Sequence, residues 1–227
     1  MVTLNSTIIS GANALAAIRP LLTENAQLLL VTDGNIARLE AATQIRSILE
    51  EGNRRVTVID TVPPEPSHHD VSQLLAGLNS GSFDVVVGIG GGSVLDVAKL
   101  LSVLCHPLSP GLDSLLAGVK PVARISSLLI PATAGTGSEA TPNAILAIPE
   151  QNTKVGIISP VLLPDYVALL PELTTSMPAH IASSTGIDAL CHLIECFTAT
   201  VANPVSDNAA LTGLAKLLKN IETACAE

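Results

Sequence analysis

The chain has 227 residues, which is enough for one large domain or for one domain and part of another. Its net charge of −9 and its 1% of aromatic residues argue against the basic surface and the stacking rings that bind nucleic acids. Mean hydropathy is high at +0.51, but no apolar run reaches about 20 residues. We therefore expect no nucleic-acid partner and no membrane span. With no signal-peptide pattern at the N-terminus, we predict a cytoplasmic protein.

Strand and helix patterns alternate through the first two thirds of the chain. The expected strands are residues 27–32, 55–59, 84–89, 125–130, 144–148 and 155–158. Helical spacing of apolar residues occurs over 36–51, 71–78 and 94–104. Strands that alternate with helices of this length form crossover units. The pattern predicts an α/β fold with a parallel sheet and helices on both faces.

The pattern becomes purely helical near Pro171, with expected helices at 187–198 and 205–225. We place an α/β domain at 1–171 and the start of an all-helical domain at 172–227. Two helices alone cannot bury both of their apolar faces, so they must pack on something else. The second helix has an apolar seam at Ala210, Leu214, Leu217, Leu218, Ile221 and Cys225. The cysteines match neither a zinc ribbon nor a disulfide framework and are expected to be buried, reduced thiols: Cys105, Cys191, Cys196 and Cys225.

A glycine run, Gly90-Gly91-Gly92-Ser93, joins an expected strand to an expected helix. Such a turn lets a phosphate approach backbone amides at the positive end of the helix. Residues 88–93 match the dinucleotide fingerprint only in part, because Ser93 stands in place of its third glycine. We expect Ser93 to cap the helix and to donate to phosphate. A purely structural turn is the alternative, and a solvated side chain is the simplest interpretation of Lys99.

A second loop, residues 131–139, follows the expected strand 125–130 and is rich in hydroxyl groups and glycine. That composition suits hydrogen bonds to a ligand at the carboxyl end of a parallel sheet, although a surface loop is the alternative. The carboxylate that would bind the adenosine ribose is ambiguous. Asp113 has the usual spacing but follows a segment interrupted by prolines, whereas Asp33 and Asp60 end upstream strands. The usual Rossmann order therefore fails, and a rearranged dinucleotide fold is needed.

Asp188 and His192 lie four residues apart on an expected helix, on one face, as a pair of metal ligands would. An exposed hydrogen bond within the helix is the alternative. Two ligands do not hold a catalytic metal tightly, since three or four are usual. The remaining histidines could complete the set in principle, but none is convincingly placed in the sequence: His68, His69, His106 and His180.

Three strings resemble the iron-containing, or type III, alcohol dehydrogenases, and they occur in that family's order. They are residues 90–99 (GGGSVLDVAK), 131–141 (PATAGTGSEAT) and 185–195 (TGIDALCHLIE). The resemblance implies an NAD-binding domain over 1–171 and an incomplete helical metal and substrate domain over 172–227, with the metal between them.

The resemblance also implies roles for individual residues. Asp33 would bind the adenosine ribose and favour NAD over NADP. The pyrophosphate would be held by Gly91, Gly92 and Ser93. The rest of the cofactor site would be lined by Thr133, Thr136, Asn143 and Lys154. Asp188 and His192 match the first two of the family's four metal ligands.

The implied reaction is hydride transfer between an alcohol or aldehyde and NAD, with Fe(II), or alternatively Zn(II), polarising the alcohol oxygen. A complete protein of this kind is expected to be a homo-oligomer. The other two metal ligands, both histidines, lie in the family beyond the last position of this sequence. We therefore expect a truncated chain with little or no dehydrogenase activity. An inactive NAD-binding remnant is the main alternative, and a lyase resembling 3-dehydroquinate synthase is another.

Overall fold

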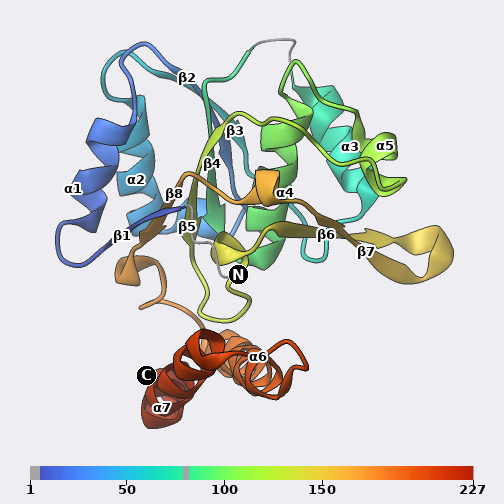
Figure 1. The fold of residues 1–227 in the computed structure, drawn as a ribbon. Coiled ribbons are helices and arrows are strands. Elements are labelled where there is room, and N and C mark those ends of the chain that lie inside the picture. The colour runs from blue at the N-terminus through green and yellow to red at the C-terminus, as the bar shows by residue number, and fades with distance from the viewer. Residues whose placement is uncertain (1–5, 79–81, 227) are drawn as a thin grey trace.

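The structure is a computed structural model that describes residues 6–78 and 82–226. Residues 1–5, which belong to the N-terminal segment searched for a signal peptide, lie outside the described residues. A layered α/β unit forms the larger part, and a pair of long helices lies beyond the carboxyl ends of the strands of its sheet (Figure 1). Among the described residues, no helix combines the length and the hydrophobicity needed to cross a bilayer.

The central sheet has six strands, and every pair in it is parallel. Its spatial order is β1 (Thr7–Ser10), β8 (Tyr166–Leu169), β5 (Ser126–Pro131), β4 (Val85–Gly90), β2 (Gln27–Val31) and β3 (Arg55–Ile59). Strands β2, β4 and β5 are buried along nearly their whole length, as apolar runs covered on both faces should be. The predicted α/β fold with a parallel sheet is confirmed.

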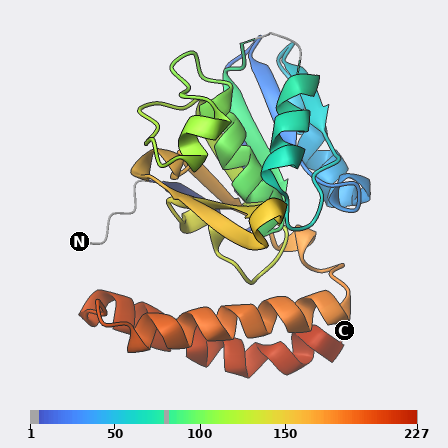
Figure 2. The same ribbon diagram turned by 90° about the vertical axis from the view of Figure 1, so that its right-hand side faces the viewer.

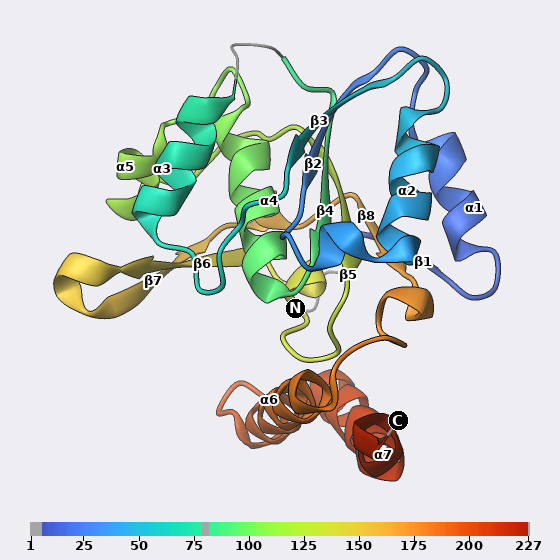
Figure 3. The ribbon, with the colours of Figure 1, turned by 180° about the vertical axis from the view of Figure 1, so that it is seen from behind.

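Helices cover both faces of this sheet. Helices α1 (Ala14–Ile18) and α2 (Glu40–Glu50) lie on one face, and α3 (His68–Gly77), α4 (Gly92–Leu104) and α5 (Leu112–Leu116) lie on the other (Figures 1 and 3). Helix α4 is the most enclosed, because every residue from Val94 to Leu104 except Asp96 is buried. Two apolar cores result, one on each side of the sheet.

Several element boundaries differ from the sequence prediction for local reasons. Helix α3 begins three residues earlier than expected, because Ser67 and Asp70 form a capping box at its amino end. The expected helix 36–51 is divided, since Leu39 is extended between a short 3₁₀ turn, Ile36–Arg38, and α2. Strands β1 and β8, which the sequence analysis did not predict, complete one side of the sheet.

Two expected sheet strands form a separate hairpin instead. Strands β6 (Asn143–Ile148) and β7 (Thr153–Ile158) pair antiparallel and do not join the six-stranded sheet. The 3₁₀ turn Pro149–Gln151 and the left-handed Asn152 connect them directly. That connection is too short for a parallel crossover, so the prediction of parallel strands here was wrong. We call this unit, residues 143–158, the β6–β7 hairpin.

The C-terminal part consists of α6 (Ala179–Thr198) and α7 (Pro204–Ala226), which run antiparallel side by side (Figure 2). They approach closely at two glycines: a Cβ on Gly186 would lie 2.7 Å from Ile221 Cδ1, and one on Gly213 would lie 2.6 Å from Leu193 Cδ2. The predicted apolar seam holds only in part, because the Leu218 side chain is exposed.

The prediction that the four cysteines are buried was wrong as well, although all four are free thiols as expected. Cys191 and Cys196 are exposed, and Cys105 and Cys225 are half-buried. Burial raises the pKa of the Cys105 thiol to about 11, so it is protonated at neutral pH. The exposed pair lies on the carboxyl-terminal half of α6, where most side chains are exposed.

Candidate functional site

The strand order contains one point at which the chain changes direction across the sheet. From β2 it moves outward to β3, then crosses back to β4 on the other side of β2 and continues to β5 and β8. In doubly wound sheets, ligands bind in the crevice at the carboxyl ends of the two strands that flank this switch point. Here those strands are β2 and β4. The order corresponds to the 2-1-3-4-5 variant of the doubly wound fold, which accounts for the failure of the usual Rossmann spacing.

The glycine run forms the turn at the carboxyl end of β4. Gly91 is the N-cap of α4, and within the described residues no side chain caps that end of the helix. The amides of the first turn are thus presented without a competing side-chain acceptor, as phosphate binding requires. Gly88 has a different role: a Cβ there would lie 2.8 Å from Ala98 Cβ, so glycine allows α4 to pack closely on β4.

Ser93 does not cap the helix, which corrects the expectation from sequence. It lies at the second helical position, and its hydroxyl accepts a hydrogen bond from the backbone N–H of Glu65 at 3.2 Å. Glu65 belongs to the loop that connects β3 to α3. The side-chain carboxylate of Glu65 also accepts a hydrogen bond from Lys154 Nζ, at 2.8 Å. Ser93 thereby connects the glycine turn to the neighbouring loop, and Glu65 extends that connection to the hairpin.

The second loop was predicted at residues 131–139 and extends to residue 142 in the structure. It leaves the carboxyl end of β5 beside the glycine turn and extends toward α6 (Figures 1 and 3). The two loops meet closely, since a Cβ on Gly91 would lie 3.4 Å from Thr133 Cγ2, and one on Gly92 would lie 2.7 Å from Thr136 Cγ2. The structure therefore brings together four of the predicted cofactor residues. At position 92 only glycine leaves room for this approach, whereas a Cβ at position 91 would be in ordinary van der Waals contact with Thr133.

A buried charge pair holds the second loop in place. Lys99 is fully buried and forms a 2.9 Å ion pair with Asp96, and its Nζ also donates to the carbonyl oxygens of Ser138 and Asn143. Asp96 in turn accepts hydrogen bonds from Ser138 Oγ at 2.6 Å and from the backbone N–H of Ile145 at 2.9 Å. The interpretation of Lys99 as a solvated side chain was therefore wrong.

Burial shifts the pKa values of two charged groups at this site, Lys99 and Glu139. Desolvation lowers the pKa of Lys99, while the adjacent Asp96 opposes that shift. Desolvation also raises the pKa of Glu139, against the smaller opposing effect of Lys99. Sequence reasoning missed Asp96 and Lys99 as supports of the site. Their spacing of three residues on a helix that is apolar almost throughout was the available signal, because a charge on such a helix needs a partner.

Asp33 follows the end of β2 by two residues, at the switch point, whereas Asp60 follows the edge strand β3 and Asp113 lies in the short helix α5. Of the three carboxylates, Asp33 has the position expected for a ribose-binding residue. Its Oδ1 accepts hydrogen bonds from the backbone N–H groups of Asn35 at 2.8 Å and Ile36 at 3.1 Å. These bonds fix the carboxylate and use only one of its two oxygens.

The β2 and β4 ends are joined directly, since Thr32 Oγ1 donates to the carbonyl of Ile89 at 2.8 Å. A pocket of about 250 Å³ lies behind this junction, between α2 and the sheet, and includes Thr32, Ile89 and Asp60 in its lining. The remaining two predicted cofactor residues lie on the β6–β7 hairpin. Asn143 begins β6, and Lys154 lies opposite Ala147 in β7. Lys154 is half-exposed and reaches Glu65, so it faces the loop that contacts the glycine turn.

Asp188 and His192 lie on the face of α6 that the second loop approaches. A Cβ on Gly135 would lie 2.9 Å from Thr185 Cβ, and Thr185 precedes Asp188 by three residues on the same helix face. Asp188 Oδ1 and His192 Nε2 are 3.9 Å apart, and both side chains are about half-exposed. A carboxylate and an imidazole at this separation suit two positions of a divalent metal ion. Gly186, by contrast, faces α7.

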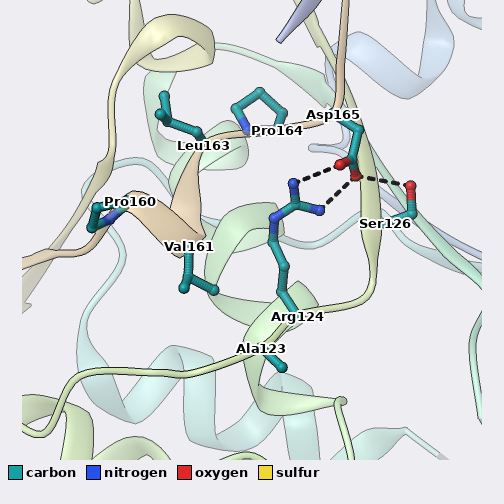
Figure 4. A pocket seen from close by; sticks show the side chains of 8 residues that line it. All are labelled: Ala123, Arg124, Ser126, Pro160, Val161, Leu163, Pro164 and Asp165. Carbon is teal, nitrogen blue, oxygen red and sulfur yellow. Dashed lines mark hydrogen bonds and ion pairs between the residues drawn. The ribbon is translucent and has the colours of Figure 1, made fainter. Parts of the chain in front are cut away.

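The amino end of the sheet contains a different feature. A pocket of about 480 Å³ lies beside the starts of β5 and β8 and is lined by residues that include Arg124, Ser126 and Asp165 (Figure 4). Arg124 and Asp165 form a two-bond ion pair, at 2.6 and 2.9 Å. Because this pocket is at the end of the sheet opposite the glycine turn, we do not assign it to the cofactor.

The strand order, the glycine turn and the second loop define a doubly wound α/β protein of the dinucleotide-binding class. A family profile described as iron-containing alcohol dehydrogenase matches residues 5–171. The chain belongs to the iron-containing alcohol dehydrogenases.

Curated relatives agree with this assignment. Long-chain-alcohol dehydrogenase 1 of Geobacillus thermodenitrificans is 34% identical over 202 residues, which cover 88% of this chain and 51% of that protein. Choline dehydrogenase of Bacillus subtilis is 36% identical over 202 residues, covering 88% and 50%. The chain thus spans about half the length of these relatives.

Solved structures match the whole chain. The iron-containing alcohol dehydrogenase of Thermotoga maritima has a TM-score of 0.91 at 30% identity, covering 100% of this chain and 63% of that one. Sulfoacetaldehyde reductase of Bifidobacterium kashiwanohense, solved in complex with NAD⁺, has a TM-score of 0.89 at 26% identity, covering 100% and 61%. Both matches include the helical pair as well as the α/β unit.

Proposed function

We propose that this chain supplies the NAD-binding site and two metal ligands of an oxidoreductase that transfers a hydride between an alcohol, or its aldehyde, and NAD. The observation that carries this proposal is the convergence of the glycine turn and the second loop at the switch point, with the second loop also touching α6 beside Asp188. Family membership supports the reaction class. The division at residue 171 into a cofactor unit and a helical unit stays a proposal, consistent with the family match ending there.

The cofactor site is assigned by the placement of its residues. Gly91, Gly92 and the amino end of α4 would bind the pyrophosphate, and Asp33 would accept hydrogen bonds from the adenosine ribose through its second oxygen. A carboxylate at that point repels a 2′-phosphate, so NAD is preferred to NADP. Ser93 would position the turn through its bond to Glu65. The nicotinamide part would be lined by side chains of the second loop and hairpin: Thr133, Thr136, Asn143 and Lys154.

The metal site is assigned to Asp188 and His192. When bound, a divalent ion such as Fe(II), with Zn(II) as the alternative, lowers the pKa of the alcohol hydroxyl. Asp188 and His192 would hold that ion on the face of α6 next to the second loop. The second loop contacts both α6 and the glycine turn. It would therefore set the distance between the metal site on α6 and the cofactor bound at the glycine turn.

A second candidate function is a NAD-binding module without turnover. The observation in its favour is that Asp188 and His192 offer two ligands and are about half-exposed, which predicts weak metal binding by the 227-residue polypeptide. NAD binding with no alcohol oxidation under Fe²⁺ or Zn²⁺ would support this candidate. A lyase reaction is the third hypothesis, and product analysis with a sugar-phosphate substrate separates it from the other two.

The decisive experiment for the oxidoreductase measures NADH formation from a panel of primary alcohols with Fe²⁺ or Zn²⁺ added. Metal-dependent turnover that is lost in Asp188→Ala supports the proposal. Glu222→Ala, which removes an exposed carboxylate from α7, is the matched control and should keep the wild-type rate. Turnover that survives Asp188→Ala at the wild-type rate would show that the metal ligands are misassigned.

The cofactor preference has its own test, in which the dissociation constants of NAD and NADP are measured by calorimetry. Asp33→Asn keeps an acceptor for the two backbone amides but removes the charge. We expect the NAD-over-NADP preference to fall about tenfold or more, because hydrogen bonds to charged groups contribute about 1.5–3 kcal/mol. Asp60→Asn changes the carboxylate after the neighbouring strand and should leave the preference unchanged. Equal effects of both variants would contradict the assignment.

A further inference from the structure

A second cluster of metal-ligating side chains lies away from α6. His68 and His69 are the first two residues of α3, and Glu150 belongs to the 3₁₀ turn between β6 and β7. His68 Nε2 is 3.0 Å from Glu150 Oε2, and His69 Nε2 contacts the other oxygen, Oε1. The ligand atoms of all three residues lie within 4.8 Å of one another. The 82 positions between His68 and Glu150 hid this grouping from the sequence.

The spacing of these atoms suits a transition-metal ion. Bond lengths of about 2.0–2.1 Å place the ligand atoms of a tetrahedral ion about 3.3 Å apart. The three atoms therefore need only small rotations of the side chains, two of which are exposed and one of which, His68, is partly buried, to surround one ion. Two imidazoles and one carboxylate also form a recurrent ligand set for such ions and leave further positions for water.

The backbone that carries these ligands is fixed on both sides. The capping box of Ser67 and Asp70 defines the first turn of α3, where both imidazoles begin. Ala147 of β6 donates its backbone N–H to the carbonyl of Pro66 at 3.0 Å, which joins the hairpin to the residue just before that turn. The imidazole rings are 3.9 Å apart between centroids, so both can reach the same ion.

The cluster is also accessible and negatively charged at its centre. The side chains of His69 and Glu150 are exposed by 57% and 56%, so an ion can enter from solvent. Each oxygen of the Glu150 carboxylate faces one imidazole nitrogen, Oε2 at 3.0 Å from His68 Nε2 and Oε1 beside His69 Nε2. A carboxylate between two imidazoles attracts a cation.

We propose that His68, His69 and Glu150 form a binding site for a divalent transition-metal ion that prefers imidazole, such as Zn²⁺ or Ni²⁺. The site is separate from Asp188 and His192, and it does not depend on the dehydrogenase assignment. A bound ion would connect the turn of the β6–β7 hairpin to the amino end of α3. It would thereby stabilise the hairpin on which Lys154 lies.

The test uses Ni²⁺ as the probe, because thiolates favour Zn²⁺ and Cu(I) and the chain has exposed cysteines. The full chain carrying Asp188→Ala and His192→Ala serves as the background, so that the α6 pair contributes nothing. Isothermal titration calorimetry should show one Ni²⁺ per chain. Adding Glu150→Gln or His69→Ala should weaken binding about tenfold or more, whereas adding His180→Ala, an exposed histidine of α6, should not.

Thermal unfolding gives a second measurement on the same variants. Ni²⁺ should raise the Tm of the Asp188→Ala, His192→Ala background and should have no such effect once Glu150→Gln is added. The removed groups are exposed, so circular dichroism should show an unchanged fold in every variant. The proposal is overturned if the background binds no Ni²⁺, or if Glu150→Gln and His69→Ala leave the affinity unchanged. Neither result would affect the assignment of Asp188 or Asp33.

Discussion

At the scale of single residues, the site depends on the absence of a side chain at position 92. A Cβ there would lie 2.7 Å from Cγ2 and 2.9 Å from Oγ1 of Thr136, closer than real Cβ atoms approach. Gly92→Ala should push the second loop away from the glycine turn. We expect NAD affinity, measured by calorimetry, to fall about tenfold or more and stability to fall by about 1–3 kcal/mol.

Two further variants test whether the clash with Thr136 causes the loss of affinity and stability. Gly77→Ala changes a helical glycine whose added Cβ would meet nothing within 4 Å, so it should leave NAD affinity unchanged. Adding Thr136→Ala to Gly92→Ala removes both clashing atoms and leaves the nearest contact, Thr136 Cβ, at 3.2 Å. This double variant should recover part of the lost stability. If it is as unstable as Gly92→Ala alone, the clash is not the cause.

Lys99 gives a second prediction at this scale, because a buried charge is costly once its partner is removed. Lys99→Met leaves Asp96 without its 2.9 Å ion pair and removes the hydrogen bond that Lys99 Nζ donates to the carbonyl of Ser138. Urea unfolding should show a loss of about 3–5 kcal/mol. Combining Asp96→Asn with Lys99→Met removes the uncompensated charge and should recover part of that loss. An equal or greater loss in the double variant would contradict the pairing.

At the scale of elements, one residue, Asp165, connects three strands at the amino end of the sheet. Asp165 accepts hydrogen bonds from Arg124, from Ser126 Oγ at 2.8 Å and from the backbone N–H of Ser127 at 2.9 Å (Figure 4). Its backbone carbonyl accepts from the N–H of Thr7 in β1 at 2.8 Å. β1, β5 and β8 are therefore held in register at a point far along the chain from the glycine turn.

The free energy of unfolding depends on pH in part through Asp165. Burial alone would raise the pKa of Asp165, but the hydrogen bonds from Arg124, Ser127 and Ser126 outweigh it and hold the pKa below its usual value. A carboxyl with a lowered pKa contributes stability that is present above about pH 3.9 and is lost as the pH falls through its lower folded-state value.

Asp165→Asn tests this contribution. It should cost about 1–2 kcal/mol in urea unfolding at pH 7, a modest value because more than a third of the Asp165 side chain is exposed. The difference from wild type should shrink when unfolding is repeated below the folded-state pKa. Asp113→Asn, in the exposed part of α5, is the control and should have little effect at either pH. A difference that is constant with pH would exclude an electrostatic origin.

At the scale of the whole molecule, local sequence determined much of the α/β unit. Short apolar runs such as Leu28–Val31 predict buried strands, because a strand covered on both faces needs a continuous apolar stretch. The glycine run at 90–93 predicts the turn after β4, because its backbone must approach a neighbouring loop closely. Helical spacing alone also predicts that Asp188 and His192 share one face of α6, where they lie 3.9 Å apart between Oδ1 and Nε2.

Tertiary structure decided what depends on distant partners. The strand order places Asp33, and neither Asp60 nor Asp113, at the switch point, because that point lies between two strands that are not consecutive in the chain. The residues 143–158 form a hairpin rather than sheet strands, and burial turns Lys99 from an expected solvated side chain into a support of the second loop. The His68, His69 and Glu150 cluster likewise exists only through packing. Local patterns specify which element forms, whereas the energy of a buried charge or a ligand set depends on atoms that only the fold brings together.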